Sequence, residues 1–275
     1  FGRPLASFGK IKEKLGRIAT NLYVSESLCY FVSSTIDRGA VDYSVEGAAT
    51  KVFNSEAVWS ATDEALQIAG GMGYMREQPY EQAMRDTRIN RIFEGTNEIL
   101  RQYIGLTGLQ KPGEYLKGLG KDLSSSLRDP RQTVPMQAVP YGRTPQIGKA
   151  HPTLHEQVVY LEDAAQALAA LCETSLRRHG RNIVEQQLQV GRIADIAIDL
   201  LALAAALART TRIIEQRGVE KAKNEISMTY TFYSDARTRI RANSRASGGH
   251  NNDQSLQDVA DAAVAAGGYQ NDFLK

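Results

Sequence analysis

The sequence predicts an all-α protein built from two groups of helices. Apolar residues recur every three or four positions through most of the 275 residues, which is the spacing of one face of an α-helix. No segment of any length alternates apolar and polar residues as a half-buried strand does. Six of the eight prolines fall within 111–152, so we expect helical units at 1–110 and 153–275 with a Pro/Gly-rich connector at 111–152.

The first unit is expected to hold four helices. Long amphipathic helices are predicted at about 5–36, ending at Asp37-Arg38-Gly39, and at about 44–68, stopping at Gly70-Gly71. A short helix is expected after Pro79, because proline suits a first helical turn. A further helix is expected after Thr96, which would cap it, and this helix is predicted to close near Gly108.

The second unit is predicted to be a helical bundle. Apolar seams run over 154–172 and 183–208, followed by helices at about 219–244 and 255–266. The second seam contains residues 200–208, nine positions without a charge, which are too few to cross a bilayer. Two interpretations of this run stay open. It is either the buried centre of the bundle or part of a helix that lies on a membrane surface or covers a partner.

Composition excludes several classes of protein. With 33 basic and 31 acidic residues the net charge is +2, which does not indicate a nucleic-acid partner. Cys29 and Cys172 both fall in helical runs and are expected to be buried, reduced thiols rather than a disulfide or a metal site. The four histidines lack ligand spacing, so no metal is expected. The sequence has no apolar run near the ~20 residues of a membrane span and no secretory leader, and it reads as a piece of a larger protein.

The stretch 85–100 contains the strongest candidate for a catalytic group. It places Glu94 between the apolar Phe93 and a Gly95-Thr96 pair, at the entry to a predicted helix. A carboxylate held by rigid backbone beside apolar groups is suited to act as a general base. A single glutamate before a helix is, however, more often solvated or paired with the helix dipole.

Three sequence motifs, in a fixed order, strengthen the case for Glu94 as a catalytic group. They are QIAGGMGY at 67–74, RDTRI at 85–89 and FEGTNEIL at 93–100. Together they resemble the C-terminal helical domain of the flavin-dependent acyl-CoA dehydrogenases. The opening FGRPLASFGKIKEKLG and the long tail resemble the branch for very long acyl chains, and its relative in respiratory-complex assembly. The resemblance implies part of a C-terminal helical bundle domain, followed by a second α-helical bundle extension.

The resemblance also implies roles for individual residues. Glu94 would be the catalytic base, and Phe93 and Gly95 would flank the substrate thioester. The turn implied to contact the FAD of a neighbouring subunit comprises Gln67, Ile68, Ala69, Gly70 and Gly71. The helix start implied to lie beside the subunit's own FAD comprises Thr96, Asn97 and Glu98. Arg85 and Asp86 are expected to hold the loop through an internal ion pair.

The implied activity is α,β-dehydrogenation of long or very long chain fatty acyl-CoA in fatty acid β-oxidation, with FAD as cofactor. The enzyme would be a homodimer that passes electrons to an electron-transferring flavoprotein, with peripheral membrane association as an open possibility. It would reside in the mitochondrial matrix, at the inner-membrane surface or in a bacterial cytoplasm. Two alternatives stay open: an acyl-CoA oxidase, or a non-catalytic helical scaffold that aids assembly.

Overall fold

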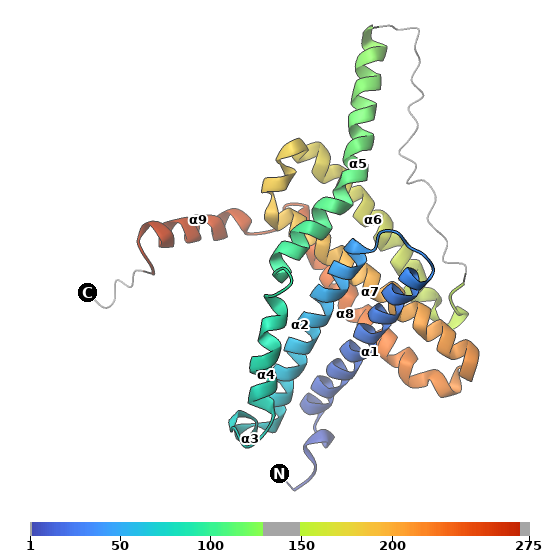
Figure 1. Cartoon of the computed structure of the whole chain (residues 1–275), viewed down its shortest axis with the longest axis vertical. Coiled ribbons are helices and arrows are strands. Elements are labelled where there is room, and N and C mark those ends of the chain that lie inside the picture. Colours follow the sequence, from blue (N-terminus) through green and yellow to red (C-terminus); the bar gives the residue numbers. More distant parts are fainter. Residues whose placement is uncertain (1, 129–148, 270–275) are drawn as a thin grey trace.

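Every element in the described part of the protein is a helix (Figure 1). The computed structural model describes residues 2–128 and 149–269. The helices are α1 (Gly9–Asp37), α2 (Ser44–Ala69), α3 (Gly71–Tyr74), α4 (Tyr80–Arg88), α5 (Asn97–Arg128), α6 (His155–His179), α7 (Gln187–Arg217), α8 (Lys223–Ser247) and α9 (Asp253–Ala265). Short 3₁₀ helices are η1 (Leu5–Ser7), η2 (Ile89–Arg91), η3 (Pro152–Leu154), η4 (Gly180–Glu185) and η5 (Glu220–Ala222). The all-α prediction is confirmed.

Helices α1 and α2 form an antiparallel pair close to the predicted ranges (Figure 1). Helix α1 begins later than expected, because residues 5–7 form a 3₁₀ turn and Phe8 is extended. Helix α2 ends as predicted at Gly70, whose φ of 61° is a conformation that glycine adopts without steric cost. The helix expected after Pro79 is α4.

Helix α5 is longer than predicted. It does not end near Gly108 but continues through Pro112 to Arg128, so the predicted connector begins as helix. Leu109 explains part of this difference, because it is buried in a cluster with residues of α6, η4 and α7: Cys172, Ile183, Val190 and Ile193. Such tertiary contacts outweigh the low helix propensity of glycine and proline. Residues 129–148 of the predicted connector lie outside the described residues.

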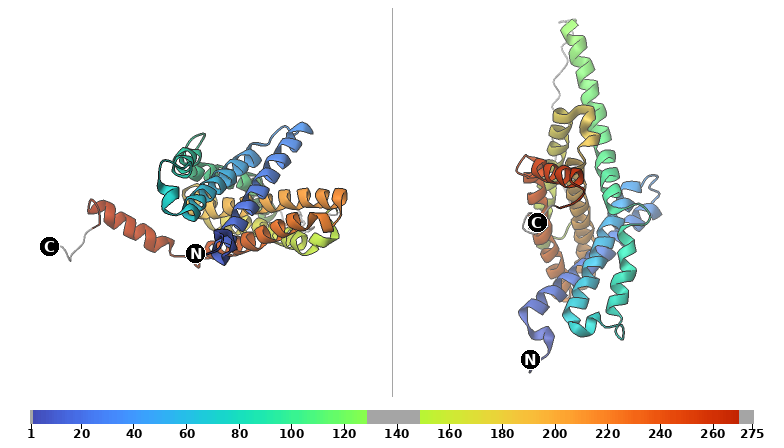
Figure 2. Two further views of the ribbon diagram at one scale, coloured as in Figure 1. Left: turned by 90° about the horizontal axis from the view of Figure 1, so that it is seen from below. Right: turned by 90° about the vertical axis from the view of Figure 1, so that its left-hand side faces the viewer.

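Helix α7 occupies the centre of the protein, and α1, α5, α6 and α8 all pack against it (Figures 1 and 2). The charge-free run 200–208 lies in this core, where Ala202 and Leu203 have no exposed surface. The interpretation that places this run on a membrane surface is therefore wrong, because α1, α6 and α8 already cover its apolar face. None of the helices in residues 2–128 and 149–269 combines the length and apolarity that a bilayer span requires.

The two predicted helical units share one core. Tyr23 of α1 shares a 2.7 Å hydrogen bond with Thr210 of α7, and Thr210 shares one of 2.6 Å with Thr229 of α8. Arg209 of α7 donates a 2.9 Å hydrogen bond to Glu26 of α1. The C-terminal helices therefore pack directly on α1, and the division into three units at 1–110, 111–152 and 153–275 stays a prediction.

Helix α9 lies apart from this core and has no buried residue. It projects to one side of the other helices in Figure 1 and in the left view of Figure 2. An ion pair ties its start to α7, with Arg192 donating a 2.8 Å hydrogen bond to Asp253.

The two cysteines differ in exposure. Cys172 is buried as expected, and burial raises the pKa of its thiol to about 11. The expectation of burial is wrong for Cys29, which lies on the exposed face of α1 and accepts a 3.2 Å hydrogen bond from the Asn54 amide.

Substitution of two glycines in α5 tests its packing on α7. A Cβ at Gly105 would lie 2.6 Å from both the carbonyl oxygen and Cγ1 of Val190, whereas a Cβ at Gly108 would meet nothing within 4 Å. We expect Gly105→Ala to lower the free energy of unfolding by about 1–3 kcal/mol. We expect Gly108→Ala to leave it unchanged or raise it by up to about 1 kcal/mol through helix propensity. Urea unfolding measures both, and equal effects would contradict this packing.

Thiol reactivity tests the burial of the two cysteines. Because the thiolate is the reactive form, we expect DTNB at pH 8 to modify Cys29 rapidly and Cys172 only after unfolding. The variant Cys29→Ser should lose the rapid phase, and Cys172→Ser should retain it. Two thiols that react at the same rate in the folded 275-residue chain would be inconsistent with the structure.

Candidate active site

The loop between η2 and α5 carries Glu94 in an unusual backbone conformation. Glu94 has a φ of 54°, and it is the one non-glycine residue in the described part of the chain with a positive φ. Gly95 follows with a φ of 88°. A left-handed conformation costs a residue with a Cβ about 1–2 kcal/mol. Such strain occurs preferentially at functional sites, where the surrounding structure holds it in place.

The apolar residues around Glu94 do not enclose it. Phe93 is 48% exposed and Ile92 is 47% exposed, and both Glu94 and Gly95 lie on the surface. Ile99 and Tyr103 of α5 are also exposed. Phe93 and Gly95, which are predicted to flank the substrate thioester, are therefore exposed and do not enclose Glu94, and their role stays a prediction.

The start of α5 is capped as predicted. The hydroxyl of Thr96 accepts a 3.3 Å hydrogen bond from the backbone N–H of Ile99. Glu98 is exposed, and a hydrogen bond from its own backbone N–H lowers the pKa of its carboxylate. The positive end of the helix dipole favours an anionic group at this position.

The side chain of Asn97 is buried, although the residue stands at the exposed start of α5. Its side chain is 1% exposed and points into the protein. Its amide nitrogen donates to Ser55 Oγ and to Glu56 Oε1, each at 2.9 Å. Its amide oxygen accepts a 2.9 Å hydrogen bond from Lys51 Nζ. The backbone of Asn97 could therefore make the predicted contact with a cofactor, but its side chain could not.

Lys51, Ser55 and Glu56 of α2 were not predicted as site residues. Lys51 Nζ also donates a 2.8 Å hydrogen bond to the carbonyl oxygen of Gly95, next to Glu94. Burial lowers the pKa of the Lys51 ammonium, and the carboxylates of Glu56, Glu98 and Glu94 act in the opposite direction. The only sequence signal was polar residues recurring at 51, 55 and 56 on one side of a largely apolar helix.

The predicted cofactor turn at 67–71 lies at the far end of α2 from the Glu94 loop. Gln67 and the Gly70-Gly71 pair are exposed, and a Cβ on either glycine would meet nothing within 4 Å. The Asn97 side chain contacts Ser55, and the helix from Ser55 to Gln67 spans about 18 Å at 1.5 Å per residue. The structure therefore does not bring the turn and Glu94 into one pocket of this chain.

Two further expectations concern Arg85 and metal ions. Arg85 pairs with Glu81, one turn earlier on α4, at 3.5 Å, so the expected internal ion pair of the Arg85-Asp86 dipeptide is replaced by a pair within the helix. Among the residues that the structure describes, no three His, Cys, Asp or Glu side chains gather in a way that would hold a metal ion.

Comparison with protein families gives two matches. Residues 1–108 match the family described as "Acyl-CoA dehydrogenase, C-terminal domain", and residues 152–269 match the one described as "ACAD9/ACADV, C-terminal domain".

Full-length relatives extend this result. The mitochondrial very long-chain specific acyl-CoA dehydrogenase of Rattus norvegicus is 38% identical over 250 residues, which cover 88% of this chain and 38% of that protein. A probable acyl-CoA dehydrogenase of Bacillus subtilis (strain 168) is 32% identical over 266 residues, which cover 90% of this chain and 43% of that protein. The chain thus spans less than half the length of these relatives.

A solved structure has the same fold. The crystal structure of an acyl-CoA dehydrogenase complexed with FAD from Bacillus anthracis matches with a TM-score of 0.72 at 29% identity, over 90% of this chain and 43% of that one. The family matches, the relatives and this fold agree, and the chain belongs to the acyl-CoA dehydrogenase family, whose C-terminal part it matches.

Proposed function

We propose that the complete protein containing this chain is an FAD-dependent acyl-CoA dehydrogenase for long or very long acyl chains, with Glu94 as catalytic base. The observation that carries the proposal is the strained, left-handed Glu94, which lies exposed in the loop before α5. The similarity to a very long-chain specific enzyme supports the class of substrate. An exposed carboxylate fixed in an unfavourable backbone conformation is suited to meet a ligand rather than to stabilise the fold.

The chemistry assigned to this chain is a proton transfer. The carboxylate of Glu94 would take the α-proton of the acyl thioester while the C–C double bond forms. FAD, when bound, accepts the β-hydrogen together with its electron pair. The backbone N–H of Glu94 would stabilise the negative charge that develops on the thioester oxygen. Phe93, with the substrate chain and the remainder of the protein, would exclude water from the reacting atoms.

The residues present fit an FAD site in two places. The start of α5, residues 96–98, presents the positive end of a helix dipole to an anionic cofactor. The turn 67–71 offers exposed backbone with open space at Gly70 and Gly71. Because these segments are separated along α2, they suit two different FAD molecules rather than one. This separation supports a homodimer in which each subunit contributes the turn to its partner's cofactor.

Electron acceptor and location follow from the same proposal. We assign an electron-transferring flavoprotein as acceptor rather than oxygen, because the relatives are described as dehydrogenases. They include mitochondrial and bacterial proteins, so the proposed location is the mitochondrial matrix, the inner-membrane surface or the bacterial cytoplasm. Helix α7 gives no support to membrane association, because its apolar run is buried.

Removal of the proposed base tests the function. In the complete protein, Glu94→Gln keeps the size of the side chain but cannot accept the α-proton. We expect the rate of FAD reduction by a long-chain acyl-CoA to fall by at least ~100-fold. Stopped-flow absorbance of the flavin measures this rate.

Glu64→Gln is the matched control, because Glu64 lies on α2 and pairs with Lys14 of α1, away from the loop. This control should reduce its flavin at the parental rate. A Glu94→Gln protein that also does so would exclude Glu94 as the base. A parental protein whose flavin does not bleach with any acyl-CoA would favour the scaffold alternative.

A further inference from the structure

The shape of residues 91–97 is imposed from outside the loop. Glu94 and Gly95 are both left-handed and both exposed, so the loop has little packing of its own. A strained non-glycine residue keeps such a conformation only when neighbouring contacts over-determine it. Within the described residues, these contacts come mainly from α2.

Lys51 provides the first restraint. Its ammonium bridges the carbonyl oxygen of Gly95 at 2.8 Å and the amide oxygen of Asn97 at 2.9 Å. It therefore ties the residue after Glu94 to the first residue of α5.

Glu56 provides the second restraint and contacts the chain on both sides of Glu94. Its Oε1 accepts a 2.9 Å hydrogen bond from the buried amide of Asn97, which follows Glu94. Its Oε2 lies 2.9 Å from Nε of Arg91, which precedes Glu94. One carboxylate on α2 thus contacts both ends of the loop that carries the proposed base, through a hydrogen bond to Asn97 and an ion pair with Arg91.

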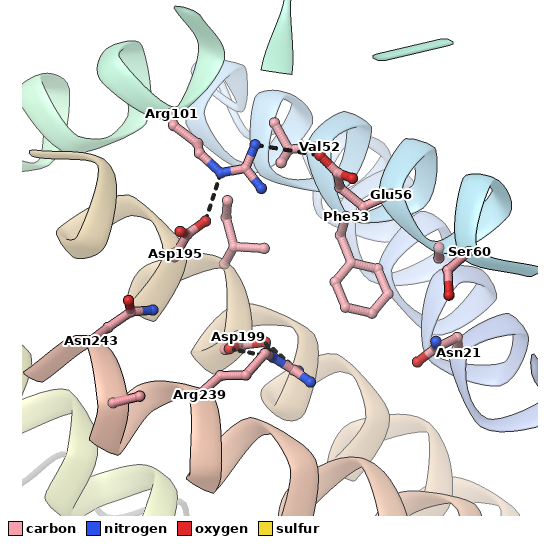
Figure 3. Close-up of a pocket in the computed structure, with 13 residues that line it drawn as sticks. Asn21, Val52, Phe53, Glu56, Ser60, Arg101, Asp195, Asp199, Arg239 and Asn243 are labelled. Carbon is pink, nitrogen blue, oxygen red and sulfur yellow. Dashed lines mark hydrogen bonds and ion pairs between the residues drawn. The ribbon is translucent and has the colours of Figure 1, made fainter. Parts of the chain in front are cut away.

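The same carboxylate is linked to the C-terminal helices. Arg101 of α5 lies 3.5 Å from Glu56 and donates a 2.6 Å hydrogen bond to Asp195 of α7. Burial opposes the charge on Arg101, but Asp195 and then Glu56 raise its pKa, so it stays cationic. The three side chains line a cavity of about 450 Å³, in which Arg101 bridges Glu56 and Asp195 (Figure 3).

We propose that Glu56 is the positioning residue for Glu94, and that Asp195 supports it through Arg101. Glu56 does not touch the substrate. By fixing Arg91 and Asn97, it restricts the path on which Glu94 moves and holds the carboxylate in line with the α-carbon. The inference rests on the proposed function, because it takes Glu94 as the base.

The variant Glu56→Gln in the complete protein tests this role. The amide keeps the size of the side chain but loses the charge that attracts Arg91 and Arg101. Because small misplacements of a catalytic group cost large factors in rate, we expect kcat to fall roughly 10- to 100-fold with KM little changed. Asp195→Asn should give a smaller loss in the same direction.

Two readouts separate positioning from a general loss of structure. With an α-deuterated acyl-CoA, the primary isotope effect on flavin reduction should increase in Glu56→Gln, since proton transfer to a misaligned base becomes more rate-limiting. A protein that is only partly folded would lose activity with the isotope effect unchanged. Hydrogen exchange should accelerate at the amides of residues 93–97 and stay unchanged in α1.

Glu64→Gln is again the matched control, because the two glutamate side chains lie on the same helix with 31% and 33% exposure. It should leave kcat, the isotope effect and loop exchange unchanged. Should Glu56→Gln fail to fold, Arg91→Gln breaks the same ion pair from the loop side and should give the same pattern.

The outcomes distinguish the two proposals. If Glu94→Gln abolishes flavin reduction but Glu56→Gln and Arg91→Gln leave kcat and the isotope effect unchanged, the positioning role is wrong and the proposed function stands. A parental isotope effect with uniformly faster exchange would also overturn it, since Glu56 would then be merely structural. If Glu94→Gln retains its rate, the proposed function itself fails.

Discussion

The candidate site depends on one buried amide, that of Asn97. Its nitrogen and oxygen are hydrogen-bonded to three side chains of α2, and it is 1% exposed. An unsatisfied buried amide would cost about 1–3 kcal/mol, so these bonds fix where α5 begins relative to α2. Since Asn97 is also the first residue of α5, the position of Glu94 and the direction of the helix dipole are determined by the same contact.

Helix α7 connects the C-terminal helices to the candidate site. Its buried face packs on α1 and α5 as well as on α6 and α8. The contact at Gly105, where α5 approaches Val190 of α7, leaves no room for a side chain. Through Asp195 and Arg101, α7 also reaches the polar network beneath the Glu94 loop. The C-terminal helices therefore pack on one another and also contact the first turns of α5 directly.

Much of the fold was predictable because helix periodicity is a local property. The approximate ranges of α1, α2 and α8 follow from the spacing of apolar residues and from glycines at their ends, and the start of α4 follows from Pro79. Helix α6 covers most of the predicted seam 154–172 and continues to His179. The end of α5 was missed because Gly108 and Pro112 disfavour helix locally, while Leu109 is held by distant partners. The run 200–208 was ambiguous, since periodicity reveals an apolar face but not what covers it.

In the candidate site, too, local features were predictable and tertiary contacts were not. Glu94 and the cap at Thr96 were found from ordered motifs within a short stretch. The contacts of Lys51 with Gly95 and of Glu56 with Arg91 were not, because they join residues 44 and 35 positions apart. The left-handed conformation of Glu94 had no sequence signal either, since the residue type that favours such a φ is glycine. The sequence did not reveal these features because they depend on tertiary packing of α2 beside the loop.

The structure of the complete protein with FAD and a long-chain acyl-CoA analogue would show whether Glu94 is held in place as the base. We predict that Glu94 keeps a positive φ, that Glu56 still contacts Arg91 and Asn97, and that a Glu94 carboxylate oxygen lies about 3–3.5 Å from the α-carbon. A Glu94 with negative φ and a carboxylate directed into solvent, with another base beside the α-carbon, would exclude Glu94 as the catalytic base.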